Sequence, residues 1–151
     1  VVQIIALEET FERTLEDPRL PFPVKIGGNV DRIELRNGRI RIIDYKTGKV
    51  DKGNVILKSW NGLTGEIKND KIIQVLAYAF MYEQYANGME MEAGIISFKN
   101  LKAGFLPFWF KPEKVAQQII SPEIMNAYLE QIILLLKEIL DMDVPFEEKV
   151  V

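Results

Sequence analysis

The chain has 151 residues and a formal net charge of −3 at pH 7, and 48% of its residues are hydrophobic. This length and apolar content predict one globular domain with its own core. Cysteine and histidine are both absent, which excludes disulfides, zinc–thiolate sites and thiol nucleophiles within these residues and removes the commonest general base. The negative charge gives no overall attraction to nucleic acid, so such a partner would need a local basic surface or metal ions.

The longest apolar runs, such as IIQVLAYAFMY, are too short and too interrupted by charge to span a membrane, and no signal peptide is visible. We therefore expect no membrane partner and, by default, a cytoplasmic protein. The chain opens on VVQIIALEETF and stops just after PFEEKVV, with neither an initiator methionine nor a natural tail. We expect it to be part of a larger protein.

The first half of the chain predicts strands. Residues 3–15 mix β-branched and aromatic residues with charge, which favours a strand over a helix. Prolines within residues 17–23 predict a loop, and residues 24–35 and 39–46 predict two strands joined by a turn at Asn37-Gly38. Residues 49–67 show no sustained period and predict a long loop of the kind that is usually functional or mobile.

The second half predicts two helices and two more strands. Residues 70–87 have apolar side chains at helical spacing, with Asn69 or Asp70 as N-cap and Asn87-Gly88 as the stop signal. The remaining segments are two predicted strands, 91–100 and 105–111, and a helix over 122–142 that begins with Ser121 as cap and a proline in its first turn. This order predicts an α/β fold with a mixed sheet flanked by helices.

The two-residue turn fixes the register of the predicted hairpin, because paired positions then sum to a constant. Three pairs have all their side chains on one face: Leu35 with Ile40, Ile33 with Ile42, and Asp31 with Asp44. The other face is predicted to be solvated or partly covered, and it carries the pairs Arg36–Arg39, Glu34–Arg41 and Arg32–Ile43.

The apolar face of this hairpin ends in two opposed carboxylates, Asp31 and Asp44, with β-carbons about 5 Å apart. Lys46 follows two residues later on the same face. Repulsion beside a core must be relieved by protonation, by a bound cation or by a nearby ammonium group. Mg²⁺ is the cation that favours a carboxylate pair plus waters. Two interpretations remain open: a divalent metal site, or neutralisation of both acids by Lys46 at a sheet end.

The predicted helix adds a second polar group. Lys71, Gln74 and Tyr78 are spaced i, i+3 and i+7 and so share one helical face. Polar residues on an otherwise apolar segment need partners, which a site at the sheet end would offer. In the alternative interpretation, Gln74 caps a buried backbone group and Tyr78 is an ordinary core residue.

The segments GNVDRIE, IIDYKTG and QVLAY, in this order and with a loop between the last two, closely resemble the PD-(D/E)XK nuclease superfamily and, within it, the RecB and AddB type of nuclease domain. The resemblance covers residues 24–85 and implies a restriction-endonuclease-like core. It implies that two acids hold a metal, that a lysine is catalytic and that a glutamine and a tyrosine on a helix line the site. These residues are, in that order, Asp31, Asp44, Lys46, Gln74 and Tyr78. The carbonyl of Tyr45 is implied as a further metal ligand.

The resemblance implies a Mg²⁺- or Mn²⁺-dependent deoxyribonuclease, an exonuclease that works beside a helicase domain or subunit in DNA-end processing and recombinational repair. A RecB-like module that binds DNA without cutting it is the main alternative, although an inactive copy commonly loses one of the residues Asp31, Asp44 and Lys46, which are all intact here. A small structural domain with an acidic ion site is a third interpretation, which would make the polar helix residues a coincidence.

The chain departs from the family in two ways. Members often have a histidine before the first motif strand, and many carry cysteines that hold an iron–sulfur cluster, but this chain has neither residue type. The stretch DVPFEEKVV resembles the segment that leads into those cysteines, so the parent protein could still hold such a cluster. Glu8 or Glu9 is a weaker candidate for a supplementary acidic ligand, and a surface charge is the favoured interpretation of both.

A basic and aromatic stretch near the C-terminal half has two interpretations. In KNLKAGFLPFWFKPEK, aromatic residues alternate with Lys99, Lys102, Lys111 and Lys114. Such a stretch could be a hairpin that faces DNA. A pair of core strands with solvated lysines is slightly favoured.

Overall fold

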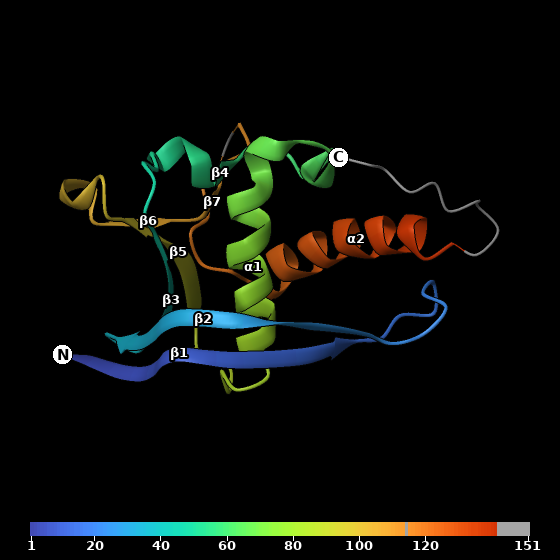
Figure 1. Ribbon diagram of the computed structural model, residues 1–151, viewed down its shortest axis with the longest axis horizontal. Helices are drawn as coiled ribbons and strands as arrows, with labels where there is room; N and C mark the ends of the chain where they lie inside the picture. The colour runs from blue at the N-terminus through green and yellow to red at the C-terminus, as the bar shows by residue number, and fades with distance from the viewer. Residues whose placement is uncertain (114, 142–151) are drawn as a thin grey trace.

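The computed structural model describes residues 1–113 and 115–141 (Figure 1). A mixed sheet of five strands has the order β1-β2-β3-β5-β6, and a second sheet pairs β4 with β7. The strands are β1 (Val2–Leu15), β2 (Val24–Arg36), β3 (Arg39–Lys46), β4 (Ile56–Leu57), β5 (Met91–Ser97), β6 (Phe105–Pro107) and β7 (Trp109–Phe110). The helices are α1 (Asp70–Glu83) and α2 (Pro122–Ile139), with the short 3₁₀ turns η1 (Lys52–Val55), η2 (Leu63–Gly65), η3 (Ile67–Asn69) and η4 (Leu101–Ala103).

The middle strand of the large sheet, β3, is antiparallel to β2 and parallel to β5. The connection between the two parallel strands runs through α1, which crosses the sheet, while α2 extends from α1 toward the tip of the β1–β2 hairpin (Figure 1). The predicted α/β fold with a mixed sheet flanked by helices is therefore confirmed. No helix in the described part of the chain is both long and apolar enough to span a membrane.

The hairpin register follows the count made from the turn. Asn37 and Gly38 both have positive φ, 54° and 76°, as a two-residue turn of the hairpin type requires. The pairs between β2 and β3 are Arg36–Arg39, Leu35–Ile40, Glu34–Arg41, Ile33–Ile42 and Arg32–Ile43. The ladder ends there, one position before Asp31 and Asp44. The predicted pairing of these two acids as ladder partners is thus not formed.

The core lies between the large sheet and α1. Ile33 and Ile42 of the hairpin are almost completely buried, and they belong to the same apolar cluster as Val75 and Leu76 of α1. The hydroxyl of Tyr128 in α2 donates to the carbonyl of Ile73 at 2.9 Å and so ties the two helices together. The apolar side chains that alternate along the strands and those at helical spacing on α1 therefore pack into one layer. This packing fixes the position of α1 over β3.

The capping and stop residues read from the sequence predict some of the helix ends correctly and others not. Ser121 caps α2, since its Oγ accepts from Ile124 N at 3.2 Å. Asn69 stands at the start of α1 but makes no side-chain cap; its amide donates to the carbonyl of Leu63 instead. The helix ends at Glu83 rather than at residue 87, because the following backbone forms tighter turns before the left-handed pair Asn87 and Gly88. The predicted end of α2 at residue 142 lies outside the described residues.

Two predicted segments differ from the structure. The long loop at 49–67 contains η1, β4, η2 and η3. The strand predicted over 105–111 divides, because β6 pairs with β5 while β7 pairs with β4 in the other sheet. Phe108, between the two, is fully buried. The division reflects pairing with β4, a strand of two residues that has no periodic signal of its own.

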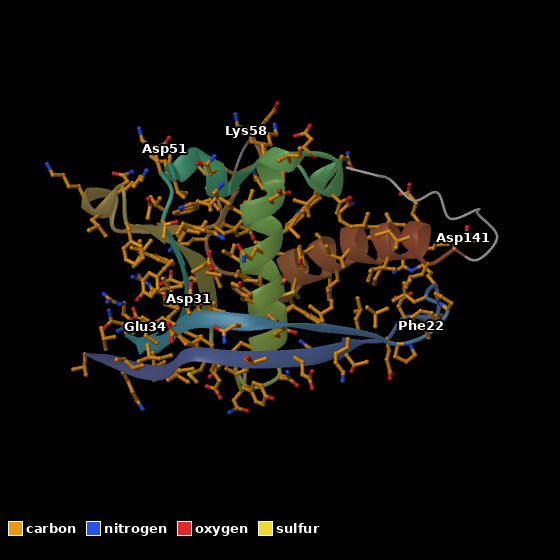
Figure 2. All side chains as sticks on the ribbon, in the orientation of Figure 1. Phe22, Asp31, Glu34, Asp51, Lys58 and Asp141 are labelled. Atoms are coloured by element: carbon orange, nitrogen blue, oxygen red, sulfur yellow. The ribbon has the colours of Figure 1, made fainter. Side chains whose placement is uncertain are left out.

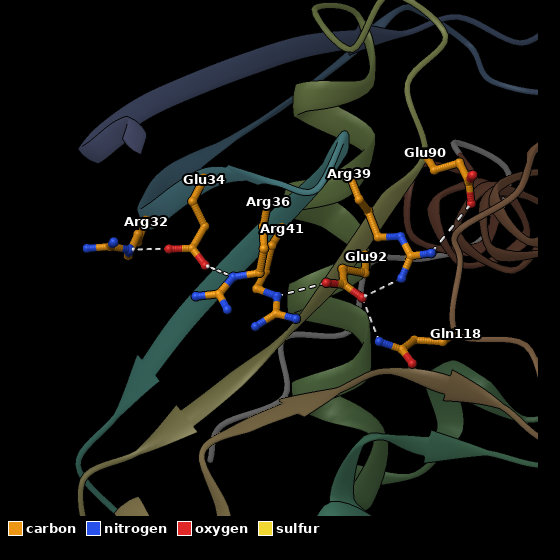
Figure 3. Close-up of polar contacts among 8 residues, drawn as sticks. All are labelled: Arg32, Glu34, Arg36, Arg39, Arg41, Glu90, Glu92 and Gln118. Atoms are coloured by element: carbon orange, nitrogen blue, oxygen red, sulfur yellow. Dashed lines mark hydrogen bonds and ion pairs between the residues drawn. The ribbon is translucent and has the colours of Figure 1, made fainter. Parts of the chain in front are cut away.

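The face of the hairpin that was predicted to be solvated or partly covered is covered by its own arginines (Figure 3). Glu34 is 2% exposed and accepts from Nε of Arg32 at 2.8 Å and Nε of Arg36 at 3.1 Å. Glu92 on β5 is equally buried and accepts from Nε of Arg41 at 2.7 Å. Burial raises the pKa of Glu34, but the hydrogen bonds and charges of the two arginines lower it by more than burial raises it, so the net shift is downward. The carboxylate of Glu34 therefore stays charged, and both glutamates are paired with arginines.

Gly94 is predicted to be essential for the packing of β5 against β6. A Cβ at this buried position would lie 2.2 Å from the carbonyl oxygen of Leu106 and 2.7 Å from Cα of Pro107, both backbone atoms. We expect Gly94→Ala to lower the free energy of unfolding by roughly 1–3 kcal/mol, measured by urea denaturation. Gly53→Ala is the matched control, since a Cβ there meets nothing within 4 Å. Equal losses in the two variants would contradict this account of the packing.

Candidate active site

The end of β3 carries the first two residues of the site. Asp44 is 4% exposed, although it is a carboxylate at the end of a strand. Nζ of Lys46 lies 3.0 Å from Oδ2 of Asp44 and forms an ion pair with it. The approach lacks hydrogen-bond geometry, so Oδ2 has no hydrogen-bond donor among the described residues.

Asp31 lies on β2 and reaches the end of β3 from that side; Figure 2 labels its position. Its Oδ2 accepts a hydrogen bond from the backbone N–H of Tyr45 at 2.7 Å. In a continued ladder, that N–H would bond to the backbone of β2. The carboxylate of Asp31 takes the place of the backbone carbonyl, which explains why the ladder stops at Arg32 and Ile43 and still holds both strands together.

The backbone of β3 directs the Tyr45 carbonyl to the side of Asp31. Ile40 N bonds to Glu90 O, and Lys46 O accepts from Phe98 N, so the even-numbered residues of β3 bond to the β5 side. Backbone groups of odd-numbered residues must then face β2. The structure therefore brings the carbonyl of Tyr45 and the carboxylate of Asp31 to one side of β3, beyond the end of the ladder.

The helix residues reach the site through the lysine. Nζ of Lys46 donates to Oε1 of Gln74 at 2.6 Å, and Nε2 of Gln74 donates to the hydroxyl of Tyr78 at 2.9 Å. A continuous polar chain thus runs from Asp44 through Lys46 and Gln74 to Tyr78. The alternative in which Gln74 caps a buried backbone group is not what the structure shows. Lys71 lies one turn earlier and is half-buried, but it makes no hydrogen bond or ion pair with the residues that are described.

The electrostatics of the site follow from burial. Burial raises the pKa of the Asp44 carboxyl, Lys46 opposes this shift, and the charge of Asp31 adds to it, so the net shift is upward. The pKa of Tyr78 is also raised, chiefly by burial and then by the charge of Asp44. The two carboxylates are therefore near enough to act on each other and on Tyr78, whose hydroxyl stays protonated at neutral pH.

Glu8 and Glu9 do not join the acid pair. Both are exposed on the edge strand β1, and within the described ranges no three acidic residues gather into a group that could hold a metal ion. Glu9 acts instead on Tyr82, whose pKa is raised first by burial and then by this charge. Their placement agrees with the favoured interpretation that they are surface charges.

The donor set of the site fits a small divalent cation. Asp31 and Asp44 supply hard carboxylate oxygens and Tyr45 a backbone carbonyl, which are the ligand types that Mg²⁺ and Mn²⁺ accept. The buried Oδ2 of Asp44 has a lone pair and no donor to satisfy it. Lys46 supplies one positive charge to this oxygen from 3.0 Å, and a divalent cation bound by both acids would supply the charge that balances the second carboxylate.

Further polar contacts that the sequence did not reveal brace this strand end. The hydroxyl of Ser97 donates to the carbonyl of Gly48 at 2.6 Å, and the amide of Asn100 donates to the carbonyl of Val50 at 3.3 Å. Ser97 pairs with Lys46 in the parallel register of β3 and β5. Only knowledge of that long-range pairing would have pointed to these residues.

The basic and aromatic stretch is resolved in favour of core strands. Phe108 is fully buried, and Phe105, Trp109 and Phe110 are half-buried in β6 and β7. Three of its lysines are exposed: Lys99, Lys102 and Lys111. Lys114 lies outside the described residues. The described part of the stretch thus has its aromatic residues in β6 and β7 or, for Phe108, between them, and its lysines solvated, and a role of the exposed lysines in binding DNA stays a prediction.

The mixed five-stranded sheet with its flanking helices is a restriction-endonuclease-like α/β fold, and its acids and lysine meet at the end of the middle strand. The family model for the PD-(D/E)XK nuclease superfamily matches residues 2–150, and the chain belongs to this superfamily. Membership supports a hydrolase that acts on nucleic acid. No curated protein matches the chain in sequence, so the RecB and AddB subtype stays a prediction.

The stability of the metal-free protein is predicted to depend on the protonation of Asp44. The ordinary pKa of an aspartate is 3.8, and burial raises it in the folded state. At a pH between the ordinary pKa and the raised folded-state pKa, the folded state binds more protons than the unfolded state. The contribution of Asp44 to the free energy of unfolding is therefore lost as the pH rises through the folded-state pKa. Asp44→Asn removes this dependence. We expect the variant to exceed the native protein in stability at pH 7.

This expectation can be checked by urea unfolding at a series of pH values in the presence of a chelator. The advantage of Asp44→Asn should shrink as the pH falls toward 3.8. Glu16→Gln is the control, because Glu16 is exposed at the end of β1. A variant that is less stable than the native protein at pH 7 would show that the ion pair with Lys46 outweighs the burial of Asp44.

Proposed function

We propose that the protein is a Mg²⁺- or Mn²⁺-dependent deoxyribonuclease, with Asp31, Asp44 and the carbonyl of Tyr45 as metal ligands and Lys46 as the catalytic cation. One observation supports it above all: the buried carboxylate of Asp44 and the carboxylate of Asp31 meet at the end of β3, beside a lysine whose ammonium group is held by a helix. The single ammonium group of Lys46 balances only one of the two carboxylates. A divalent cation bound between them would balance the second.

The roles of the side chains follow from their contacts. A divalent cation bound there would activate a water molecule at neutral pH and polarise an oxygen of the scissile phosphate. Lys46 would place a positive charge beside the scissile phosphate, and its bond to Gln74 fixes the direction of the ammonium group before substrate binds. Tyr78 in turn fixes Gln74 and, being protonated, adds no charge to the site. Both helix residues orient Lys46 rather than react.

The substrate and biological context rest on the family and on the motifs. Contacts to phosphate and metal carry little sequence information, so we expect cleavage with little sequence preference. The resemblance of the motifs to RecB and AddB nuclease domains supports an exonuclease in DNA-end processing and recombinational repair, beside a helicase domain or subunit. The ion pair between Asp44 and Lys46 equally fits the alternative of a module that binds DNA without cutting it.

Labelled linear and circular DNA separate these functions. Incubated with Mg²⁺, the protein should degrade the linear form and spare the circular form, since an exonuclease needs an end. A chelator should stop the reaction. Degradation of both forms would retain the nuclease and contradict the exonuclease. Retention of both forms, with binding intact in a gel-shift assay, would replace the nuclease by the binding module.

Asp44 and Lys46 are predicted to differ in their effects on metal binding and cleavage. Lys46→Ala should leave Mn²⁺ affinity intact or increase it, because a nearby positive charge is removed. Its rate of DNA cleavage should fall at least a hundredfold, about 3 kcal/mol in transition-state stabilisation. Asp44→Ala should lose both properties. Calorimetry with Mn²⁺ and a cleavage assay on the same preparations measure the two effects.

Two exposed residues serve as controls for these variants. Glu9→Gln should keep the Mn²⁺ affinity of the native protein, since Glu9 does not lie with the acid pair. Lys49→Ala should keep most of the cleavage rate, since Lys49 is an exposed lysine three residues after Lys46. Native cleavage by Lys46→Ala would show that Lys46 only neutralises the acids. Native Mn²⁺ affinity of Asp44→Ala would remove the proposed metal site.

A further inference from the structure

An exposed aromatic ring stands at the same strand end as the proposed catalytic residues. Phe98, directly after β5, is 54% exposed. Its ring stacks on that of Tyr45, with centroids 5.5 Å apart and planes inclined by 21°. Tyr45 lies between Asp44 and Lys46 in β3. Because Tyr45 occupies one side of the Phe98 ring, the exposed area belongs to the opposite side and the edge.

The backbone around Phe98 is fixed to the active-site strand. Phe98 N donates to the carbonyl of Lys46 at 2.9 Å. On either side, Ser97 and Asn100 bond to the backbone carbonyls of Gly48 and Val50. The ring is therefore held in place before any ligand arrives, which lowers the entropic cost of binding to it.

The segment that carries the ring is basic although the chain as a whole is acidic. Between Glu92 and Glu113 the sequence contains no acidic residue and three lysines, in a chain of net charge −3. Lys99 directly follows Phe98 and Lys102 comes four residues after it; both are exposed, and Lys102 belongs to η4, which protrudes beyond β5 and β6 in Figure 1. An open aromatic face beside ammonium groups is the combination that binds unpaired bases and the phosphates that link them.

We infer that Phe98, backed by Tyr45, is a stacking platform for an unpaired nucleobase of the strand whose phosphate enters the site at Asp31 and Asp44. This inference rests on the proposed function and adds the substrate class, which is single-stranded or frayed DNA. In a duplex, each base is already stacked and paired, so it offers no free face to the ring. The platform therefore favours a single-stranded end over a closed duplex.

A cycle of two changes, one in the protein and one in the DNA, tests the contact. The native protein and Phe98→Ala are each titrated with a single-stranded oligonucleotide and with the same oligonucleotide made abasic at its central positions. Affinity is measured by fluorescence anisotropy in chelator, so that cleavage plays no part. We expect Phe98→Ala to weaken binding of the complete oligonucleotide about tenfold. Binding of the abasic form should change little, because no base is present to stack.

The chain offers a closely matched control. Phe22 is 53% exposed, nearly the same as Phe98, but lies at the tip of the β1–β2 hairpin, at the opposite end of the molecule from Asp31 (Figure 2). Phe22→Ala should bind both oligonucleotides like the native protein. Phe98→Trp should keep the preference for the complete oligonucleotide, because an indole ring also stacks. A 2-aminopurine placed in the oligonucleotide should lose fluorescence on binding to the native protein and lose less with Phe98→Ala.

The possible outcomes separate the platform from the nuclease. If Phe98→Ala binds both oligonucleotides like the native protein, while the native protein cuts DNA, the platform is wrong and the nuclease stands. If Phe98→Ala weakens binding of both forms equally, the ring does not contact a base, and the platform is again wrong. If the native protein neither binds nor cuts DNA, both proposals fail. A loss confined to the complete oligonucleotide supports the platform.

Discussion

The burial of one carboxylate, that of Asp44, is the constraint to which the rest of the site responds. A charge in this position costs free energy because water is largely removed from it, and its raised pKa records that cost. Lys46 offsets part of the cost through the ion pair, and α1 holds Lys46 through Gln74 and Tyr78. The helix is thus tied to the sheet by a polar chain as well as by the apolar core around Val75.

Buried carboxylates on the two faces of the sheet have different partners. On one face, Glu34 and Glu92 are paired with arginines, so the protein itself balances their negative charge. On the other, Asp44 keeps an oxygen without a donor. Glu34 and Glu92 lie on β2 and β5, the two strands on either side of β3, which carries Asp44, so all three acids belong to neighbouring strands of one sheet. Each glutamate is balanced by arginines, whereas the single Lys46 stands beside two aspartates, and a bound cation would balance the remaining negative charge.

The end of a β-ladder is also where this fold exposes its backbone. Because β2 and β3 separate after Arg32 and Ile43, the N–H of Tyr45 is met by a side chain, Asp31, and its carbonyl faces the same side. On the β5 side the pairing continues to Lys46 and Phe98, and this carries the aromatic stack to the strand end. Three consecutive residues of β3, Asp44 to Lys46, therefore bring together one acid, the lysine and the contacts to Asp31 from β2 and to Phe98 after β5.

The sequence by itself determined the features that depend on short-range periodicity. Turn chemistry at Asn37-Gly38 set the hairpin register, the strand period put Asp44 and Lys46 on one face, and the helical period put Gln74 and Tyr78 together. Tertiary structure decided what depends on distant partners. The pairing of β3 with β5 brought Phe98 to Tyr45, β4 divided the strand predicted at 105–111, and the position of α1 brought Gln74 to Lys46. A local pattern says which way a side chain faces, whereas its partner depends on how segments far apart in the chain pack, and that packing has no local signature.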